Sequence, residues 1–280
     1  MDGTFNYAPK YFTQIYNILG YHNGFYIQLA FVFLVGKSEV LYTDMWKMLL
    51  DLCQQEVGAE PSIDELHLDF ELSAVNSLSD VFPDSKIVLC RFHLGQSFIK
   101  KMMELLLILC YKNNDSETGN WLKLFFGLPF LPPCEVPEGF TTIFAIAPEC
   151  PKADKFADYV LNTYVKDDAR FPPKLWAAAP DGIESPRTTN GVEAHNKHYN
   201  SQFYSSHPSC HVVIDNLIDI QAEVYVKIKT QTQKKATSSS KISEKKAKLV
   251  HKLYTQYQSD EITLLEYLRK VGLKYLPVTV

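Results

Sequence analysis

The stretch Glu65-Leu-His-Leu-Asp-Phe-Glu-Leu72, followed by Lys86-Ile-Val-Leu-Cys-Arg-Phe-His93, decides how this chain of 280 residues folds. Each stretch begins as a short apolar strand, and residues 72–81 between them have the apolar spacing of a helix. Strand, helix and strand within this length predict a parallel crossover. An Asp at the carboxyl end of such a strand lies at the crevice where α/β sheets place their chemistry. Asp69 is therefore our first candidate site residue, with a helix cap or turn residue as the alternative.

Three further polar motifs accompany Asp69. Asp2 opens the chain in Asp2-Gly-Thr-Phe5, Cys90 and His93 are separated by two residues, and Arg187-Thr-Thr-Asn-Gly-Val-Glu-Ala-His195 begins a late predicted helix that carries Glu193. Two of them have a simpler interpretation. Asp2 could be a terminal residue without a role, and Glu193 could form a surface ion pair with Lys197, four residues later on the same helix.

In this order, the motifs resemble the catalytic domain of Mutator-like element (MULE) transposases. That family has an early Asp-Gly-Thr-Phe, an Asp-Phe-Glu, a Cys-x-x-His and a late Asn-x-x-Glu, and the resemblance covers about residues 1–225. It implies an α/β fold with a ribonuclease-H-like mixed five-stranded sheet flanked by helices. It also implies an acidic triad and a supporting set. The triad is Asp2, Asp69 and Glu193, and the supporting residues are Cys90, His93 and Asn190.

The resemblance further implies a DNA transposase that cuts phosphodiester bonds and transfers strands at transposon ends. Such chemistry uses two Mg²⁺ (or Mn²⁺) ions held by carboxylates. By this implication Asp2 bridges both ions, Asp69 holds one and Glu193 holds the other. The expected partner is DNA with terminal inverted repeats. Because two DNA ends must be paired, we expect a homo-oligomer when they are bound.

Cys90 and His93 also form half of a possible zinc site. His195 and His198 could supply the other half, although they follow about a hundred residues later, far from the spacing of a compact zinc finger. We therefore favour support of the active site over a structural zinc. The neighbours His67 and Glu71 are expected to have no direct role.

Residues before Asp69 predict the rest of the sheet. Segments 11–19 and 25–35 are rich in aromatic and β-branched residues and predict an antiparallel hairpin beside the Asp2 strand. A helix is expected over 39–57. A central strand needs partners along its length, so we expect the Asp2 strand to extend upstream of Met1.

The domain plan follows from composition shifts along the chain. A long apolar helix is expected at 92–111, and candidate helices beyond it lie at 121–128, 152–165 and 173–178, with a long proline-rich loop between the first two. A helix at 212–229 should pack on the core. The expected divisions are a first part of the core at 1–112, a mostly helical insertion at 113–186, completion of the core at 187–229, a flexible basic linker at 230–252 and C-terminal helices at 253–280.

Composition sets the outer bounds. An apolar content of 46% fits a large folded domain, and six irregularly spaced cysteines suggest reduced thiols. No apolar run approaches the ~20 residues of a membrane span, so no membrane partner is expected. Residues 227–252 hold nine Lys and one Glu, a charge of +8, which leaves −12 for the rest of a chain whose net charge is −4.

This charge distribution bears on function. The DNA substrate and the lysine-rich stretch at 234–248 favour nuclear localisation, whereas the acidic remainder of the chain counts against autonomous DNA binding. Two alternatives to a transposase therefore stay open. One is a truncated or domesticated relic that binds DNA or chromatin without catalysis, and the other is a metal-dependent nuclease of the same fold.

Overall fold

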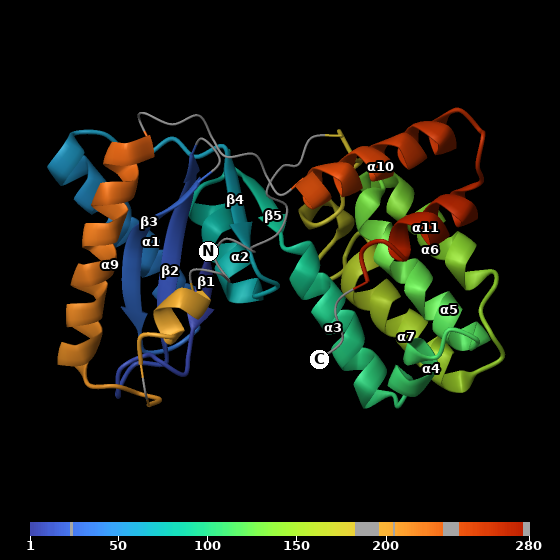
Figure 1. Cartoon of the computed structure of the whole chain (residues 1–280), viewed down its shortest axis with the longest axis horizontal. Helices are drawn as coiled ribbons and strands as arrows, with labels where there is room; N and C mark the ends of the chain where they lie inside the picture. The colour runs from blue at the N-terminus through green and yellow to red at the C-terminus, as the bar shows by residue number, and fades with distance from the viewer. Residues whose placement is uncertain (23–24, 183–195, 204, 232–240, 277–280) are drawn as a thin grey trace. The chain divides into compact units, whose positions relative to one another are not determined.

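The computed structural model describes residues 1–22, 25–182, 196–203, 205–231 and 241–276, without the side chains of residues 2, 22, 25, 231 and 241–243 (Figure 1). Contacts divide the chain into two compact units. Unit 1 is Met1–Val88 with Thr188–Ser239, and unit 2 is Leu89–Arg187 with Ser240–Val280. The fold is mixed α/β, and helices dominate it. The described strands form two sheets, of three and of two strands.

The larger sheet begins unit 1. Its strands β1 (Asp2–Thr4), β2 (Gln14–His22) and β3 (Phe25–Leu34) are antiparallel in the order β1-β2-β3. The predicted hairpin and its place beside the Asp2 strand are confirmed. Alternation along β2 gives the sheet two apolar faces. On one face, Ile15 belongs to a cluster of buried apolar residues. On the other face, the ring of Tyr16 contacts the ring of Tyr42 in the following helix, with ring centroids 5.3 Å apart.

That helix, α1 (Glu39–Val57), has the predicted bounds because both of its ends are capped. The Ser38 side chain accepts a hydrogen bond from the Leu41 amide at the N-terminus. Gly58 ends the helix with a φ of 75°, in the left-handed region that favours glycine.

The second sheet is the predicted crossover, β4 (Glu65–Leu68), α2 (Leu72–Val81) and β5 (Lys86–Leu89). The Lys86 amide donates to the carbonyl of Asp64, the residue before β4, at 2.9 Å. The beginnings of the two strands therefore lie together and the strands run in the same direction. Their carboxyl ends must then lie together as well.

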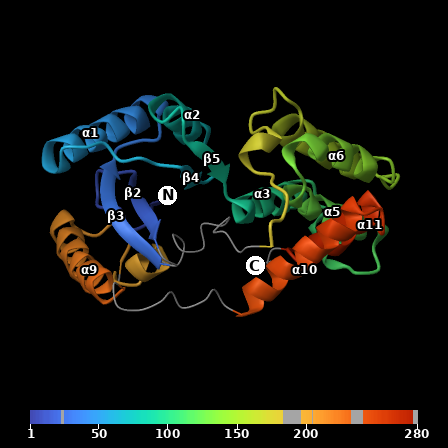
Figure 2. The same ribbon diagram turned by 90° about the horizontal axis from the view of Figure 1, so that it is seen from above.

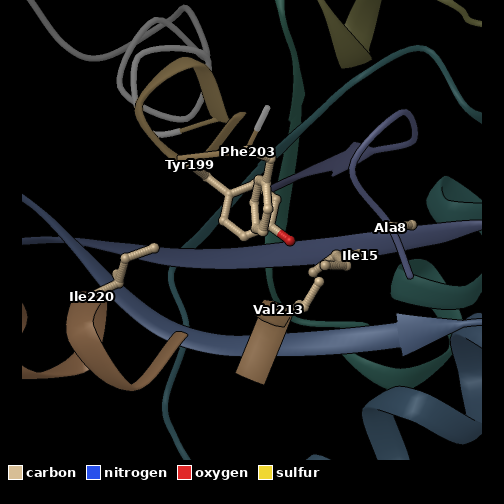
Figure 3. Packing of buried hydrophobic residues seen from close by; sticks show 6 residues of the cluster. All are labelled: Ala8, Ile15, Tyr199, Phe203, Val213 and Ile220. Atoms are coloured by element: carbon tan, nitrogen blue, oxygen red, sulfur yellow. The ribbon is translucent and has the colours of Figure 1, made fainter. Parts of the chain in front are cut away.

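Helix α9 (Cys210–Gln231) covers the face of β2 and β3 opposite to α1 (Figure 2). Val213 and Ile220 of α9 are buried with Ile15 of β2 and with two aromatic residues of the segment before α9, Tyr199 and Phe203 (Figure 3). The prediction that the 212–229 helix packs on the core is thus confirmed.

Unit 2 is helical around an aromatic core. Phe98 of α3 (Arg91–Glu104) lies 5.7 Å from Phe126, 6.0 Å from Phe156 and 5.6 Å from Tyr164, measured between ring centroids. The other elements between α3 and the C-terminal helices are α4 (Ile108–Lys112), α5 (Glu117–Leu124), η1 (Phe125–Phe130), η2 (Pro133–Glu135), α6 (Val136–Phe144), α7 (Pro151–Val160), η3 (Leu161–Val165) and η4 (Pro173–Leu175).

Three sequence predictions in unit 2 are wrong. The helix expected over 92–111 is broken between α3 and α4, where Leu106 has a φ of 58°. The expected proline-rich loop contains α6, since Pro137 sits in the first turn, where a helix tolerates proline. The part of the expected linker from residue 241 is helix α10 (Lys241–Gln258), whose Val250 and Leu253 are buried.

The last helix, α11 (Leu264–Gly272), packs on η1, α5 and α6 of unit 2. Gly127 allows this approach, because a Cβ at that position would lie 2.7 Å from the carbonyl oxygen of Leu268. Within the described residues, no helix has the length and apolarity that a membrane span would need.

Candidate active site

Asp69 follows β4 directly and lies half-buried at the carboxyl end of the strand. Its backbone carbonyl accepts a hydrogen bond from the amide of Glu71 at 2.8 Å, which turns the chain from β4 into α2. The alternative reading of Asp69 as a helix cap is not supported, because Glu71 occupies the N-cap position of α2. Asp69 is therefore held by backbone geometry at a strand end, as predicted.

The strand that carries Asp2 contacts β4. The nitrogen of Met1 donates a hydrogen bond to the carbonyl oxygen of His67, at 2.7 Å. Met1 and Leu68 are both buried, with exposed fractions of 6% and 1%. On its other side Asp2 is the backbone partner of Asn17 in β2. The chain segments that carry Asp2 and Asp69 are thus neighbours.

Cys90 and His93 come close to Asp69. Their sulfur and ring nitrogen and a carboxylate oxygen of Asp69 all lie within 4.8 Å of one another. Cys90 follows β5, the hydrogen-bonded neighbour of β4, and His93 lies in the first turn of α3. A thiolate, an imidazole and a carboxylate suit zinc, whereas Mg²⁺ takes oxygen ligands. Of these three residues only Asp69 therefore fits a magnesium site.

Glu71 has a structural role that the sequence did not reveal. Its carboxylate accepts a hydrogen bond from the Tyr42 hydroxyl at 3.0 Å, and that hydroxyl accepts one from the Gln14 amide at 2.8 Å. The Lys37 ammonium lies 3.5 Å from the same carboxylate. Tyr42 and Gln14 are fully buried. This relay joins the turn after Asp69 to α1 and β2, and no short-range sequence pattern links its members.

Residues 196–200 are helical and lie against β1. Asn17 donates to the side-chain oxygen of Asn196 at 2.5 Å, and the Thr4 hydroxyl donates to that of Asn200 at 2.9 Å. The hydroxyl of Tyr199 donates to the carbonyl of Tyr7 at 3.1 Å. The helix that follows Glu193 in sequence is therefore fixed to the strand that contains Asp2.

An open cavity of about 400 Å³, entirely within unit 1, lies where this helix meets the chain leaving β1. We name it the β1 pocket. Amide, hydroxyl, aromatic and ammonium groups line it, which gives it mixed polar chemistry. Its lining residues are Gly3, Thr4, Phe5, Asn6, Asn196, Lys197 and Asn200.

The remaining predicted site residues fall elsewhere. The side chain of Asp2 and residues Asn190, Glu193 and His195 lie outside the described residues, so the predicted triad is described only at Asp69. His198, considered as a zinc ligand, lies 3.6 Å from the carboxylate of Glu223 on α9.

Electrostatics at β4 favour a neutral histidine. Burial lowers the pKa of His67, and its 3.2 Å contact with the Glu65 carboxylate opposes that effect only in part. The pKa of Glu65 is lowered in turn, mainly by its hydrogen bond with Lys86 at 2.6 Å. The ion pair between Glu65 and Lys86 therefore links β4 to β5 through solvent-exposed side chains.

Comparison with protein families identifies the N-terminal part of the chain. Residues 1–97 match the family model of the MULE transposase domain. The match includes the five strands of the described residues and the Asp2, Asp69, Cys90 and His93 motifs. It ends before residues 98–225, which the sequence resemblance also included. No curated protein and no solved structure matched the chain.

Proposed function

We propose that this chain, which has a MULE transposase domain over residues 1–97, is a DNA transposase whose catalytic centre uses the carboxylates of Asp2, Asp69 and Glu193. The domain itself supports a transposase-related function with DNA as the substrate. The finer assignment, of cleavage and strand transfer at transposon ends, is our inference. It draws on the strand-end position of Asp69 and on the contact between β1 and β4.

The hydrogen bond from Met1 to His67 carries the proposal. In a parallel ladder, a residue whose N–H donates to the carbonyl of residue j lies opposite residue j+1. If β1 runs parallel to β4, this bond pairs Met1 with Leu68 and Asp2 with Asp69, and the shared burial of Met1 and Leu68 agrees. The two sheets are then parts of one ribonuclease-H-like sheet in the order β3-β2-β1-β4-β5.

The third acid is proposed from the next contact. Asn196, three residues after Glu193, receives a hydrogen bond from Asn17, which is the partner of Asp2 in the sheet. A helix anchored at this point would begin close to Asp2. Three carboxylates from separate elements would then meet at one sheet edge, which is the arrangement that two divalent cations require.

In this proposal two Mg²⁺ or Mn²⁺ ions, when bound, supply an activated hydroxyl nucleophile and stabilise the leaving oxygen. The protein supplies position. The turn after β4 holds Asp69, and the Gln14–Tyr42–Glu71 relay holds that turn against α1 and β2. Cys90 and His93 flank Asp69 and support its orientation.

The experiment that tests this function is metal-dependent nicking of supercoiled plasmid DNA by the full chain. Asp69→Asn should lower the rate roughly 1,000-fold or more, because it removes a carboxylate ligand of the metal while keeping the shape of the side chain. Asp64→Asn is the matched control, since Asp64 is exposed and precedes the same strand. It should leave nicking unchanged.

Two results would contradict the proposal. Nicking that survives in Asp69→Asn would exclude the assigned site. Absence of metal-dependent nicking by a wild-type chain that still binds DNA would favour the alternative of a binding protein without catalysis.

Nuclear localisation and oligomerisation on paired DNA ends belong to the same proposal. The lysine-rich stretch at 234–248 supports the nuclear assignment.

A further inference from the structure

We infer that the β1 pocket binds one unpaired nucleotide of the DNA strand. The inference rests on the proposed function for the identity of the strand, and on the chemistry of the pocket for the form of the ligand. A cavity of about 400 Å³ is within the usual size of small-molecule sites. The pocket could therefore admit a base with its sugar.

The amide groups of the pocket suit the edge of a base. Asn6, Asn196 and Asn200 contribute three amides, and each amide carries both donors and acceptors. Asparagine is the residue type that pairs with the edge of adenine through two hydrogen bonds. The Thr4 hydroxyl holds the Asn200 amide by donating to its oxygen at 2.9 Å, so the amide is oriented before a ligand arrives.

Phe5 offers a surface on which a base can stack. Its side chain is 40% exposed, although the residues around it, Thr4 and Ala8, are buried. The Lys37 ammonium lies 4.1 Å from the centroid of the Phe5 ring and covers one face of it. Base–aromatic stacking tolerates every base, because each has a π face. Phe5 would therefore contribute affinity without strict sequence selection.

Lys197 supplies the charge for the phosphate of the same nucleotide. It is the one cationic residue among those lining the described pocket, and it is exposed. A site for free phosphate would be expected to gather several cations or a run of backbone N–H groups. One ammonium beside three amides and an aromatic ring fits a nucleotide better than a bare anion.

The location of the pocket connects it to the proposed chemistry. Thr4 lies two residues beyond Asp2 on β1, a distance of about 7 Å along a strand. A nucleotide in the pocket would therefore lie next to a phosphate bound at the proposed carboxylate centre. Such a nucleotide must leave its partner strand to enter, so the pocket would favour unpaired or frayed DNA ends over intact duplex.

The test is a binding titration of the full chain without divalent metal, with fluorescence anisotropy of a labelled single-stranded oligonucleotide and of the same sequence as a blunt duplex. We expect the single strand to bind more tightly. Phe5→Ala should weaken that binding roughly 5- to 150-fold without changing its salt dependence. Lys197→Gln should reduce the slope of log K against log salt by about 0.7.

Matched controls exist for both variants. Tyr11→Ala removes another exposed aromatic residue, and Lys47→Gln removes another exposed lysine, and neither lines the pocket. Both should bind as the wild type does.

As a second readout, an oligonucleotide containing 5-iodouracil should form a photo-cross-link to the peptide that contains Phe5, and competition with unlabelled single strand should suppress it.

The outcomes separate this inference from the proposed function. Wild-type affinity in Phe5→Ala, a cross-link that maps elsewhere, or no single-strand binding by the wild type would overturn the pocket assignment. Loss of nicking in Asp69→Asn together with unaffected binding by Phe5→Ala would keep the proposed function and reject the pocket. Unchanged nicking in Asp69→Asn together with weakened binding by Phe5→Ala would keep the pocket and reject the catalytic assignment.

Discussion

Asp69 and Glu71 stand two residues apart but have different roles. Glu71 occupies the N-cap position of α2, and its carboxylate accepts a hydrogen bond from the Tyr42 hydroxyl. Asp69 lies at the end of β4 beside Cys90 and His93. The short sequence Asp-Phe-Glu therefore combines a candidate ligand with the residue that anchors its turn. The position after a strand marks Asp69 in the sequence, whereas only the tertiary contacts reveal the anchoring role of Glu71.

The relay predicts the effect of Tyr42→Phe. This change removes the hydroxyl that bridges Gln14 and Glu71, and it leaves the fully buried Gln14 amide with a weaker set of partners. We expect a loss of about 1–3 kcal/mol in the free energy of unfolding. Denaturant titration should show a lower midpoint with an unchanged slope. Tyr21→Phe, at a half-exposed position, should change nothing, and equal midpoints for both variants would exclude the relay.

His67 predicts a pH dependence of stability. Burial lowers its pKa in the folded state, so between that value and the ordinary 6.5 the unfolded chain holds more protons. The free energy of unfolding then rises with pH in this window. The stabilisation is complete above about pH 6.5 and is lost progressively as the pH falls from 6.5 to the folded-state pKa of His67. The hydrogen bond with Lys86 lowers the pKa of nearby Glu65 below its usual range, so this carboxylate stays ionised down to about pH 5.

The variant His67→Gln isolates this effect. Unfolding midpoints measured between about pH 5 and 8 should fall less steeply toward acid in His67→Gln than in the wild type. A wild-type profile that is flat over this range, or one that the substitution does not alter, would show that His67 does not carry the dependence.

At the scale of elements, α9 is held by one apolar stripe. Ile220 is 4% exposed and packs against the sheet, while Ile218, two residues earlier, is 57% exposed. Ile220→Ala should therefore cost about 2–5 kcal/mol of stability. Ile218→Ala, the same chemical change on the same helix, should stay within about 0.5 kcal/mol of the wild type. Similar losses in both variants would mean that α9 is packed differently.

Sequence patterns predicted the elements that local signals define. Helix α1 has its predicted bounds because Ser38 caps it and Gly58 ends it, and the β4–α2–β5 crossover is correct because its apolar strands are short and clearly bounded. Failures occurred where tertiary contacts outweigh composition. Residues 241–252 looked like a basic linker, but the buried Val250 and Leu253 give α10 an apolar stripe among its lysines.

The candidate site was predictable only in part for the same reason. Asp69 could be found from its place after a strand, and Cys90 and His93 from their spacing. The Gln14–Tyr42–Glu71 relay and the β1 pocket could not, because each joins residues that are far apart in sequence and have no shared periodicity. Pairing of distant polar side chains depends on the final fold, and no window of sequence contains it.

At the scale of the whole molecule, the described contacts form two cores. Unit 1 contains the described strands up to Val88, helices α1, α2 and α9, and the helical residues 196–200, whereas unit 2 contains the helices from α3 to η4 together with α10 and α11. Helix α3, which we had placed with the first part of the core, belongs to unit 2. The strands, Asp69 and the β1 pocket therefore belong to a body that is completed by a segment about a hundred residues away in sequence.

The most direct test of the central claim is protein cleavage by hydroxyl radicals formed at Fe²⁺ bound in place of Mg²⁺. We predict cuts near residues 2, 69 and 193, which excess Mg²⁺ suppresses and which Asp69→Asn abolishes, because all three carboxylates should share one pair of metal ions. Cuts confined to residues 69 and 90–93, suppressed by Zn²⁺ but not by Mg²⁺, would contradict the account and assign Asp69 to a zinc site with Cys90 and His93.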